Sequence, residues 1–205
     1  MAKSKSSGRW LQEHFDDKYV KMAHKAGYRS RAVYKLVEIQ EKYHIIKRGH
    51  VVVDLGAAPG SWSQVAVGWV KPTGKVIALD ILDMPFLQGV DFIQGDFHEE
   101  SVLLQLESLL EGKAVDVVLS DMAPNTSGMK AVDQPKRMHL AELALEFAQK
   151  HLTKKGSFVT KLFQGEGFAA YVVMLRQTFK KVVIFKPEAS RGRSQEVYVV
   201  AIDKT

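Results

Sequence analysis

Short apolar runs alternate with amphipathic stretches along most of this chain, and that alternation limits the folds open to it. Runs typical of buried strands lie at 51–55, 75–79, 90–93, 115–119 and 156–161. Stretches with helical spacing lie at 30–43, 60–70, 98–110, 133–152 and 166–179. Strands that alternate with helices form a parallel sheet covered on both faces, with right-handed crossovers. The pattern therefore predicts an α/β fold of the Rossmann-like kind.

Two more strands are expected at 181–185 and 196–202, with no helix between them. The connecting loop of about ten residues is shorter than a parallel crossover requires, so these strands should pair antiparallel. The sequence thus predicts a mostly parallel, seven-stranded sheet with one reversed strand near an edge.

The segment DLGAAPG at 54–60 follows the first strand, at the edge where such sheets bind their ligands. Gly56 permits a tight turn and lets a ligand approach the backbone closely, and Gly60 leads into the next helix. Ala58 stands where a dinucleotide-binding motif needs its second glycine, and Pro59 stiffens the loop. The turn is therefore better suited to a ligand without a pyrophosphate.

Acidic residues follow the next three strands, at Asp80, Asp96 and Asp121. A carboxylate at Asp80 can accept hydrogen bonds from both hydroxyls of an adenosine ribose, and Asp96 can accept from the adenine amino group. Each acid alone is equally explained as a helix cap, but three at successive strand ends suit a cationic nucleoside. S-adenosylmethionine has a sulfonium, an ammonium and no phosphate, and is the cofactor that we expect.

Several motifs resemble those of the FtsJ-type ribose methyltransferases: DLGAAPGSW (54–62), LD (79–80), GD (95–96) and SDMAPN (120–125). The resemblance covers nearly the whole chain and includes GYRSRAVYKL at 27–36. By motif position it implies that S-adenosylmethionine contacts Gly60, Trp62, Asp80, Asp96 and Asp121. It also implies that the domain at 30–205 is a methyltransferase domain.

The same resemblance implies a catalytic set of Lys35, Asp121, Lys161 and Glu196, with Lys161 as the proton acceptor. A ribose hydroxyl is a weak acid, so its methylation needs alignment and a base. Lys161 ends the fifth strand, beside the fourth, and so faces the same crevice as Asp121. A second lysine nearby and partial desolvation lower the pKa of a lysine, which favours this role.

The other members of the set have less certain tasks. Lys35 would bring the second positive charge, steady a developing oxyanion or hold a phosphate, and Glu196 would position Lys161 or the hydroxyl. Without the resemblance, Lys35, Lys161 and Glu196 would each also be explained as ordinary solvated side chains.

Two features point away from methylation of bases. The chain has no cysteine, which excludes a mechanism that needs a cysteine adduct, as well as disulfides and thiolate metal sites. The fourth-strand motif SDMAPN also differs from the Asn/Asp-Pro-Pro-aromatic loop that serves base amino groups. Both observations favour an oxygen as the methyl acceptor.

The net charge of +6 is carried by the first 35 residues, which hold nine Lys/Arg and three acidic residues. We expect residues 1–29 to form a basic arm that binds RNA phosphates, although a solvated tail has the same composition. The basic loop at 186–194 is a second candidate for a phosphate clamp; its alternative is an ordinary hairpin loop.

Other expectations are absences. No apolar run approaches the ~20 residues that span a bilayer, and no apolar stretch follows the basic N-terminus as in a secretory signal, so a cytoplasmic protein is expected. The seven histidines lack metal-ligand spacing, so no metal is expected. A monomer is expected because no additional apolar helix suggests self-association.

The resemblance implies a substrate that the residues themselves do not name. It is a uridine in the A-loop of 23S rRNA, presented by the assembled large ribosomal subunit. Three alternatives remain: a methyltransferase acting on tRNA or an RNA cap, an assembly factor that binds RNA without catalysis, and a nicotinamide oxidoreductase on a similar sheet.

Overall fold

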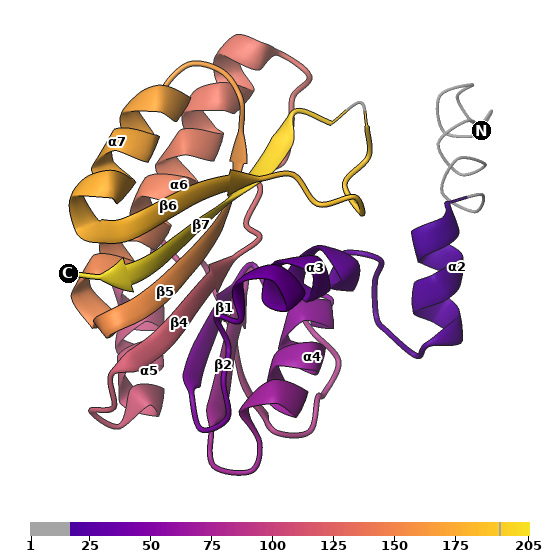
Figure 1. Cartoon of the computed structure of the whole chain (residues 1–205), viewed down its shortest axis with the longest axis vertical. Coiled ribbons are helices and arrows are strands. Elements are labelled where there is room, and N and C mark those ends of the chain that lie inside the picture. Colours follow the sequence, from indigo (N-terminus) through magenta and orange to yellow (C-terminus); the bar gives the residue numbers. More distant parts are fainter. Residues whose placement is uncertain (1–16, 193) are drawn as a thin grey trace.

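A computed structural model describes residues 17–192 and 194–205, which form one sheet between two layers of helices (Figure 1). The strands are β1 Val51–Leu55, β2 Lys75–Asp80, β3 Val90–Gln94, β4 Val115–Ser120, β5 Leu152–Phe163, β6 Phe179–Phe185 and β7 Glu196–Lys204. The helices are α2 Lys18–Lys25, α3 Val33–Tyr43, α4 Ser61–Val70, α5 Glu100–Leu110, α6 Lys130–His151 and α7 Phe168–Thr178.

The sheet has seven strands in the order β3-β2-β1-β4-β5-β7-β6. The neighbours from β3 to β5 pair parallel, whereas β7 pairs antiparallel with both β5 and β6. The reversed strand is thus next to the edge, and the predicted α/β fold with a mostly parallel seven-stranded sheet is confirmed. Reversal of β7 matters for function, because it brings the beginning of β7 to the edge where β1, β4 and β5 end.

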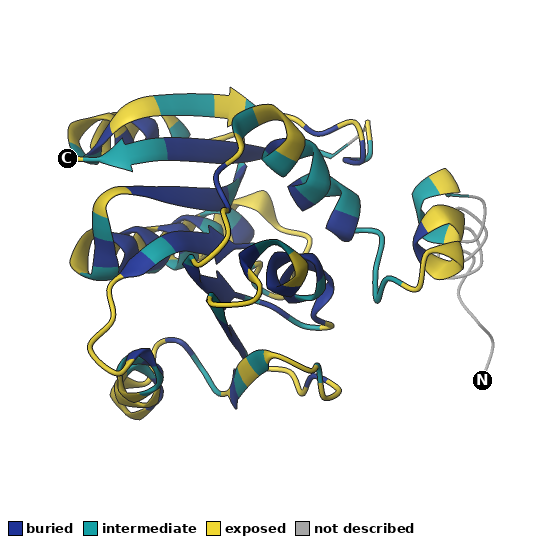
Figure 2. Ribbon diagram, turned by 60° about the horizontal axis from the view of Figure 1, so that its bottom comes forward, coloured by how far each residue is buried: buried dark blue, intermediate teal, exposed yellow. Residues whose placement is uncertain are grey.

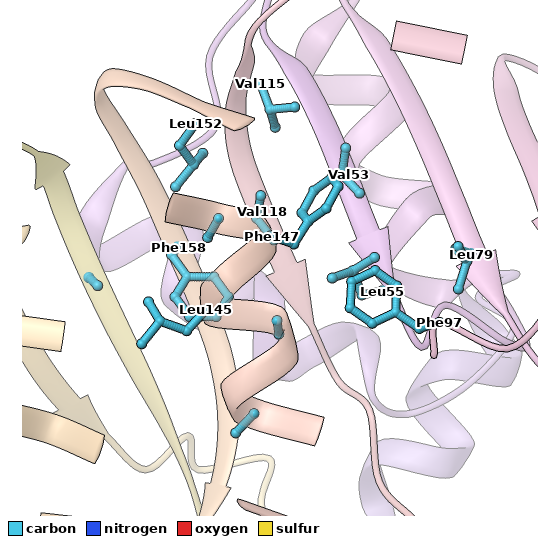
Figure 3. Packing of buried hydrophobic residues seen from close by; sticks show 14 of the residues in the cluster. Val53, Leu55, Leu79, Phe97, Val115, Val118, Leu145, Phe147, Leu152 and Phe158 are labelled. Atoms are coloured by element: carbon cyan, nitrogen blue, oxygen red, sulfur yellow. The ribbon is translucent and has the colours of Figure 1, made fainter. Parts of the chain in front are cut away.

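The central strands are buried on both faces, which explains their uninterrupted apolar runs. Val53 and Leu55 of β1 pack beneath α5, α6 and α7 with Leu145 and Phe147 (Figure 3). Val52, on the opposite face, packs with α3 and α4. Because side chains alternate between faces, Val117 and Leu119 of β4 and Val159 of β5 also point toward α3 and α4.

Most boundaries differ from the expected ones by a few residues, and two of the differences have a structural reason. Helix α6 begins at Lys130, before Asp133, because the Asp133 carboxylate accepts hydrogen bonds from the backbone N–H groups of Ser127 and Gly128 and so fastens the preceding loop. Strand β5 begins at Leu152, which was expected in the helix. Leu152 pairs with Val115, and the register then shifts before the regular pairing of the strand resumes.

Helix α2 projects from the body of the domain (Figures 1 and 2). It is tied to the body through an ion pair between Asp17 and Arg31 and through the rings of Tyr19 and Tyr34, whose centroids lie 5.5 Å apart. Of the predicted arm at 1–29, residues 1–16 lie outside the described residues. Among the described residues, the structure contains no helix with the length and apolar character that a membrane crossing requires.

Candidate active site

The acidic residues picked out at the strand ends meet at one edge of the sheet. Asp80, Asp96 and Asp121 line a cleft of about 490 Å³, together with Gly56. The cleft continues over Met122 to Asn125 after β4 and reaches His139 on α6. Parallel strands bring their carboxyl ends to the same edge, so residues distant in sequence face one cavity.

Gly56 and Gly60 shape the turn beside this cleft, with φ of 76° and 98°. A Cβ added to Gly56 would lie 2.8 Å from the backbone nitrogen of Met122, so no side chain fits between the two loops. The Asp80 carboxylate accepts a hydrogen bond from the Ala58 N–H at 2.8 Å and fixes the turn against β2. The first strand's turn and the second strand's acid therefore form one rigid unit.

Asp96 has an interaction of its own at the far end of the cleft. Its Oδ1 lies 3.0 Å from the backbone nitrogen and 2.6 Å from Nδ1 of His98. The backbone and side-chain hydrogen bonds from His98 lower the pKa of Asp96. This carboxyl is thus held ionised, as an acceptor must be.

A fourth acid, Asp54 of β1, is fully buried behind the glycine turn. Its Oδ2 accepts a hydrogen bond from the Ser63 hydroxyl at 2.6 Å, while Oδ1 has no hydrogen-bond partner among the described residues. Burial raises the pKa of Asp54 to about 7 against the Ser63 hydrogen bond, with help from the charges of Asp121 and Asp80. The cleft is therefore backed by a buried carboxyl group, and three further acids line the cleft itself.

This chemistry fits S-adenosylmethionine. A cationic ligand would offset the converging carboxylates. The glycine at residue 56 lets the turn pack directly against the loop after β4, at the wall of the cleft. The acceptors at Asp80 and Asp96 are separate positions along the cleft, as the ribose and the adenine of one nucleoside require.

The predicted catalytic residues assemble at the other end of the cleft. Lys161 Nζ lies 3.1 Å from Asp121 Oδ1 and also donates to the Asp121 backbone carbonyl. Lys35 of α3 pairs with Glu196 at 2.7 Å. Glu196 was expected to position Lys161 or the hydroxyl, but the structure places it against Lys35, and Ser190 donates a further hydrogen bond to it.

Tyr198 joins these two ion pairs and was not identified from the sequence. Its hydroxyl donates to Asp121 Oδ1 at 2.6 Å and accepts from Lys35 Nζ at 3.2 Å. Burial, with the nearby charges of Asp121 and Glu196, raises the pKa of Tyr198 well above its usual value, so the hydroxyl stays a donor. Its position two residues after Glu196 on a strand, and therefore on the same face, was the available signal.

Asp121 also responds to this network. Burial would raise the pKa of Asp121, but the ammonium groups of Lys161 and Lys35 and the Tyr198 hydrogen bond outweigh that effect, and the pKa is lowered. The carboxylate thus remains charged while it lines the cofactor cleft and contacts Lys161.

A second cavity, of about 520 Å³, opens on the other side of the network. It is lined by Arg31, Lys35, Arg191, Ser194 and Glu196. Its basic loop at 186–194 is held by α3, because Glu38 accepts hydrogen bonds from the backbone N–H groups of Glu188 and Ala189 at 2.7 and 2.8 Å. Arg193, in the same loop, lies outside the described residues.

Two expected cofactor contacts are not among the residues lining the cleft. The indole of Trp62 is buried and donates a 2.8 Å hydrogen bond to the Ala32 carbonyl, and its ring packs on Tyr198. Gly60 precedes α4, and an added Cβ would meet Arg29 and Met84. The indole of Trp62 is thus engaged, and so is the backbone of Gly60, whose N–H donates to the Ala57 carbonyl and whose carbonyl accepts from the Gln64 N–H. The role of these two residues in cofactor binding stays a prediction.

Solved structures share this architecture. A putative ribosomal RNA methyltransferase from Plasmodium falciparum has 29% sequence identity and a TM-score of 0.77, over 86% of this chain and 98% of that one. A putative rRNA methylase from Clostridium thermocellum shares the fold, with 18% identity and a TM-score of 0.54 over 83% and 97% of the two chains. The chain thus has the Rossmann-like fold of structures that are named as ribosomal RNA methyltransferases.

Sequence relatives narrow the class. Residues 28–204 match the family model of the FtsJ-like methyltransferases. The proteins named ribosomal RNA large subunit methyltransferase E from Stenotrophomonas maltophilia and Chromobacterium violaceum are 59% and 58% identical, covering 98% of this chain and 96% and 98% of their own lengths. The chain therefore belongs to the FtsJ-like methyltransferase family, and the expected methyltransferase activity class is confirmed.

Proposed function

We propose that this protein transfers a methyl group from S-adenosylmethionine to the ribose 2′-hydroxyl of a uridine in the A-loop of 23S rRNA, on the assembled large ribosomal subunit. The names of the relatives support a large-subunit rRNA substrate. The observation that carries the proposal is the chain of contacts from Lys161 through Asp121 and Tyr198 to Lys35 and Glu196. It joins an acidic cleft on one side to a basic cavity on the other.

The cofactor residues follow from the shape and charge of the cleft. The glycine turn at Gly56, with Gly60 and the backbone of Trp62, would border the methionine end, and Asp121 would face its ammonium. Asp80 would accept from the ribose hydroxyls, and Asp96 from the adenine amino group. S-adenosylmethionine supplies an electrophilic methyl group when bound.

The chain's own residues would then act on the ribose. Lys161 must first release the proton of the ammonium form that pairs with Asp121. Its amine then takes the proton of the 2′-hydroxyl as the ribose oxygen gains the methyl group. Asp121 orients Lys161, and Lys35 places a positive charge beside the developing negative charge. Glu196 holds Lys35 in place, and the cavity lined by Arg31 and Arg191 accepts the flanking phosphates.

The basic arm at 1–29 would extend this RNA surface, with 30–205 as the methyltransferase domain. Lys18, Lys21 and Lys25 of α2 are exposed and spaced so that they share one helix face. An arm beside the basic cavity adds phosphate contacts without needing to read sequence. A cytoplasmic monomer that works on ribosomal particles is consistent with this arrangement.

The test uses tritiated S-adenosylmethionine and large subunits from cells that lack the gene. Nuclease digestion maps the label, and Lys161→Ala is assayed in parallel. Label on a single ribose of 23S rRNA with the wild type alone is the expected result. Label on tRNA, on a base, or on no RNA at all would overturn the proposal.

A further inference from the structure

A second cavity rich in lysine lies at the opposite edge of the sheet from the active site. It has a volume of about 270 Å³, and its walls come from the end of α3, the start of β5 and the end of β7. Lys47, Lys154 and Lys155 line it together with Tyr43 and the imidazoles of His44 and His50. Neither the cofactor nor the methylated ribose reaches this edge in the proposed function.

Two more lysines surround the same cavity. The Nζ atoms of Lys42 and Lys181 lie 5.7 and 5.9 Å from the ring centroid of Tyr43, which lines it. Lys42 also lies 4.8 Å from the ring of Phe185, which packs edge-on against Tyr43. Five exposed ammonium groups and an aromatic pair thus share one surface.

These lysines differ from those of the active site in lacking anionic partners. Within residues 17–192 and 194–205, no carboxylate oxygen lies within 4.0 Å of any of the five. Two acids line the cavity, Asp116 and Asp203, and Asp116 is engaged by the Val51 N–H at 2.8 Å. By contrast, Lys35 and Lys161 are each paired with a carboxylate.

We propose that this lysine-lined cavity is a second RNA-binding site, which holds backbone phosphates of the substrate RNA far from the methylated nucleotide. Unpaired ammonium groups beside aromatic rings favour a polyanion, since phosphates release counterions on binding and bases stack on rings. The inference rests on the proposed function, because it assumes that the substrate is RNA.

The distance between the two sites specifies the kind of RNA. Ser157, in the wall of the cavity, and Lys161 are four residues apart on the regularly paired part of β5, roughly 13 Å at about 3.3 Å per residue. A fragment of one or two nucleotides that contains the target is too short to contact both sites. A folded domain of ribosomal RNA can reach both, so the second site discriminates in favour of large, structured substrates.

The test compares Lys154→Glu/Lys155→Glu with Lys113→Glu/Arg176→Glu, which changes the net charge equally on α7 and after α5. We expect the KM for large subunits to rise about tenfold in the first variant, with kcat, cofactor affinity and activity on a short target RNA unchanged. The dependence of log kcat/KM on log salt should become shallower by about 1 to 2, since each lost phosphate contact contributes about 0.9. Lys42 and Lys181 lie on other elements, and Lys42→Glu/Lys181→Glu should change the KM and the salt dependence in the same way. This variant replaces the first one if Lys154→Glu/Lys155→Glu does not fold.

Several outcomes would overturn the inference: an unchanged KM, an equal rise in the control variant, or an equal rise on the short RNA. Weakened binding to subunits with unchanged binding to protein-free 23S rRNA would instead assign the surface to a ribosomal protein. Failure of the wild type to methylate any RNA would overturn the proposed function, whereas filter binding of labelled 23S rRNA by the variants still tests the second site.

Discussion

The two sides of the active-site crevice are built from different kinds of segment. On the cofactor side, Asp80, Asp96 and Asp121 follow successive strands and meet because parallel strands end together. On the catalytic side, Lys35 comes from α3, Lys161 from β5, and Tyr198 with Glu196 from the reversed strand β7. The first group is assembled by topology alone, while the second depends on how α3 packs across the sheet.

The two sides also differ in charge. On the cofactor side, burial raises the pKa of Asp54, and the nearby charges of Asp121 and Asp80 add to that shift. On the catalytic side, carboxylates alternate with ammonium groups and a tyrosine hydroxyl in an uninterrupted chain. The cofactor side is suited to bind a cation, whereas the charges of the catalytic side already balance one another. Substitutions on the two sides should therefore affect cofactor binding and catalysis separately.

The largest expected effect comes from removing the base. Lys161→Ala should lower kcat on the order of 10³-fold, within the range that a general base contributes, and should leave cofactor affinity within about twofold. Asp80→Asn should instead lower cofactor affinity and leave kcat nearly unchanged, because it weakens an acceptor of the cleft that also fixes the Ala58 turn. Calorimetric binding of S-adenosylmethionine and single-turnover methylation measure the two quantities, and loss of both in either variant would contradict the separation.

The second prediction concerns pH and the buried acid of the cofactor side. Because the folded-state pKa of Asp54 is raised to about 7, its stabilising contribution is complete below the unfolded pKa, near 4, and is lost as the pH rises through 7. The loss is at most about 4 kcal/mol, since one pKa unit corresponds to 1.36 kcal/mol. Asp54→Asn removes the ionisation and should abolish that decline.

Urea unfolding of the cofactor-free protein at pH 5 and pH 8 measures this effect. The wild type should lose more stability than Asp54→Asn between the two values. Parallel behaviour of the two proteins would mean that Asp54 is ionised in the native state and that burial does not raise its pKa.

The same contrast explains what the sequence could and could not reveal. The strands, their parallel order and the strand-end acids follow from local patterns, since a buried strand must be apolar and a sheet brings its ends together. The pairing of Glu196 with Lys35 rather than Lys161 depends on the tertiary approach of α3, and no local pattern encodes it. Tyr198 was not identified from the sequence, because its hydroxyl partners lie 77 and 163 residues away.

The third prediction tests the close approach of the two loops at the glycine turn. Gly56→Ala should cost about 1 to 3 kcal/mol of stability through its left-handed backbone and should further weaken cofactor binding, because the new Cβ lies 2.8 Å from the Met122 backbone. Gly112→Ala is the matched control, since Gly112 has a similar φ of 73° and no atom within 4 Å of the added Cβ. Equal cofactor affinities in the two variants would show that the loop contact does not shape the cleft.

The smallest expected effect is at the residue that joins the two ion pairs. Tyr198→Phe keeps the ring against Trp62 but removes the hydroxyl between Lys35 and Asp121. We expect kcat to fall about tenfold, roughly 1.4 kcal/mol of transition-state stabilisation, with the KM for cofactor unchanged and the pH–rate profile displaced. A loss of stability without a change in kcat would reduce Tyr198 to a packing residue. The ion pairs Lys161–Asp121 and Lys35–Glu196 would then act independently in catalysis, although the Tyr198 hydroxyl connects them.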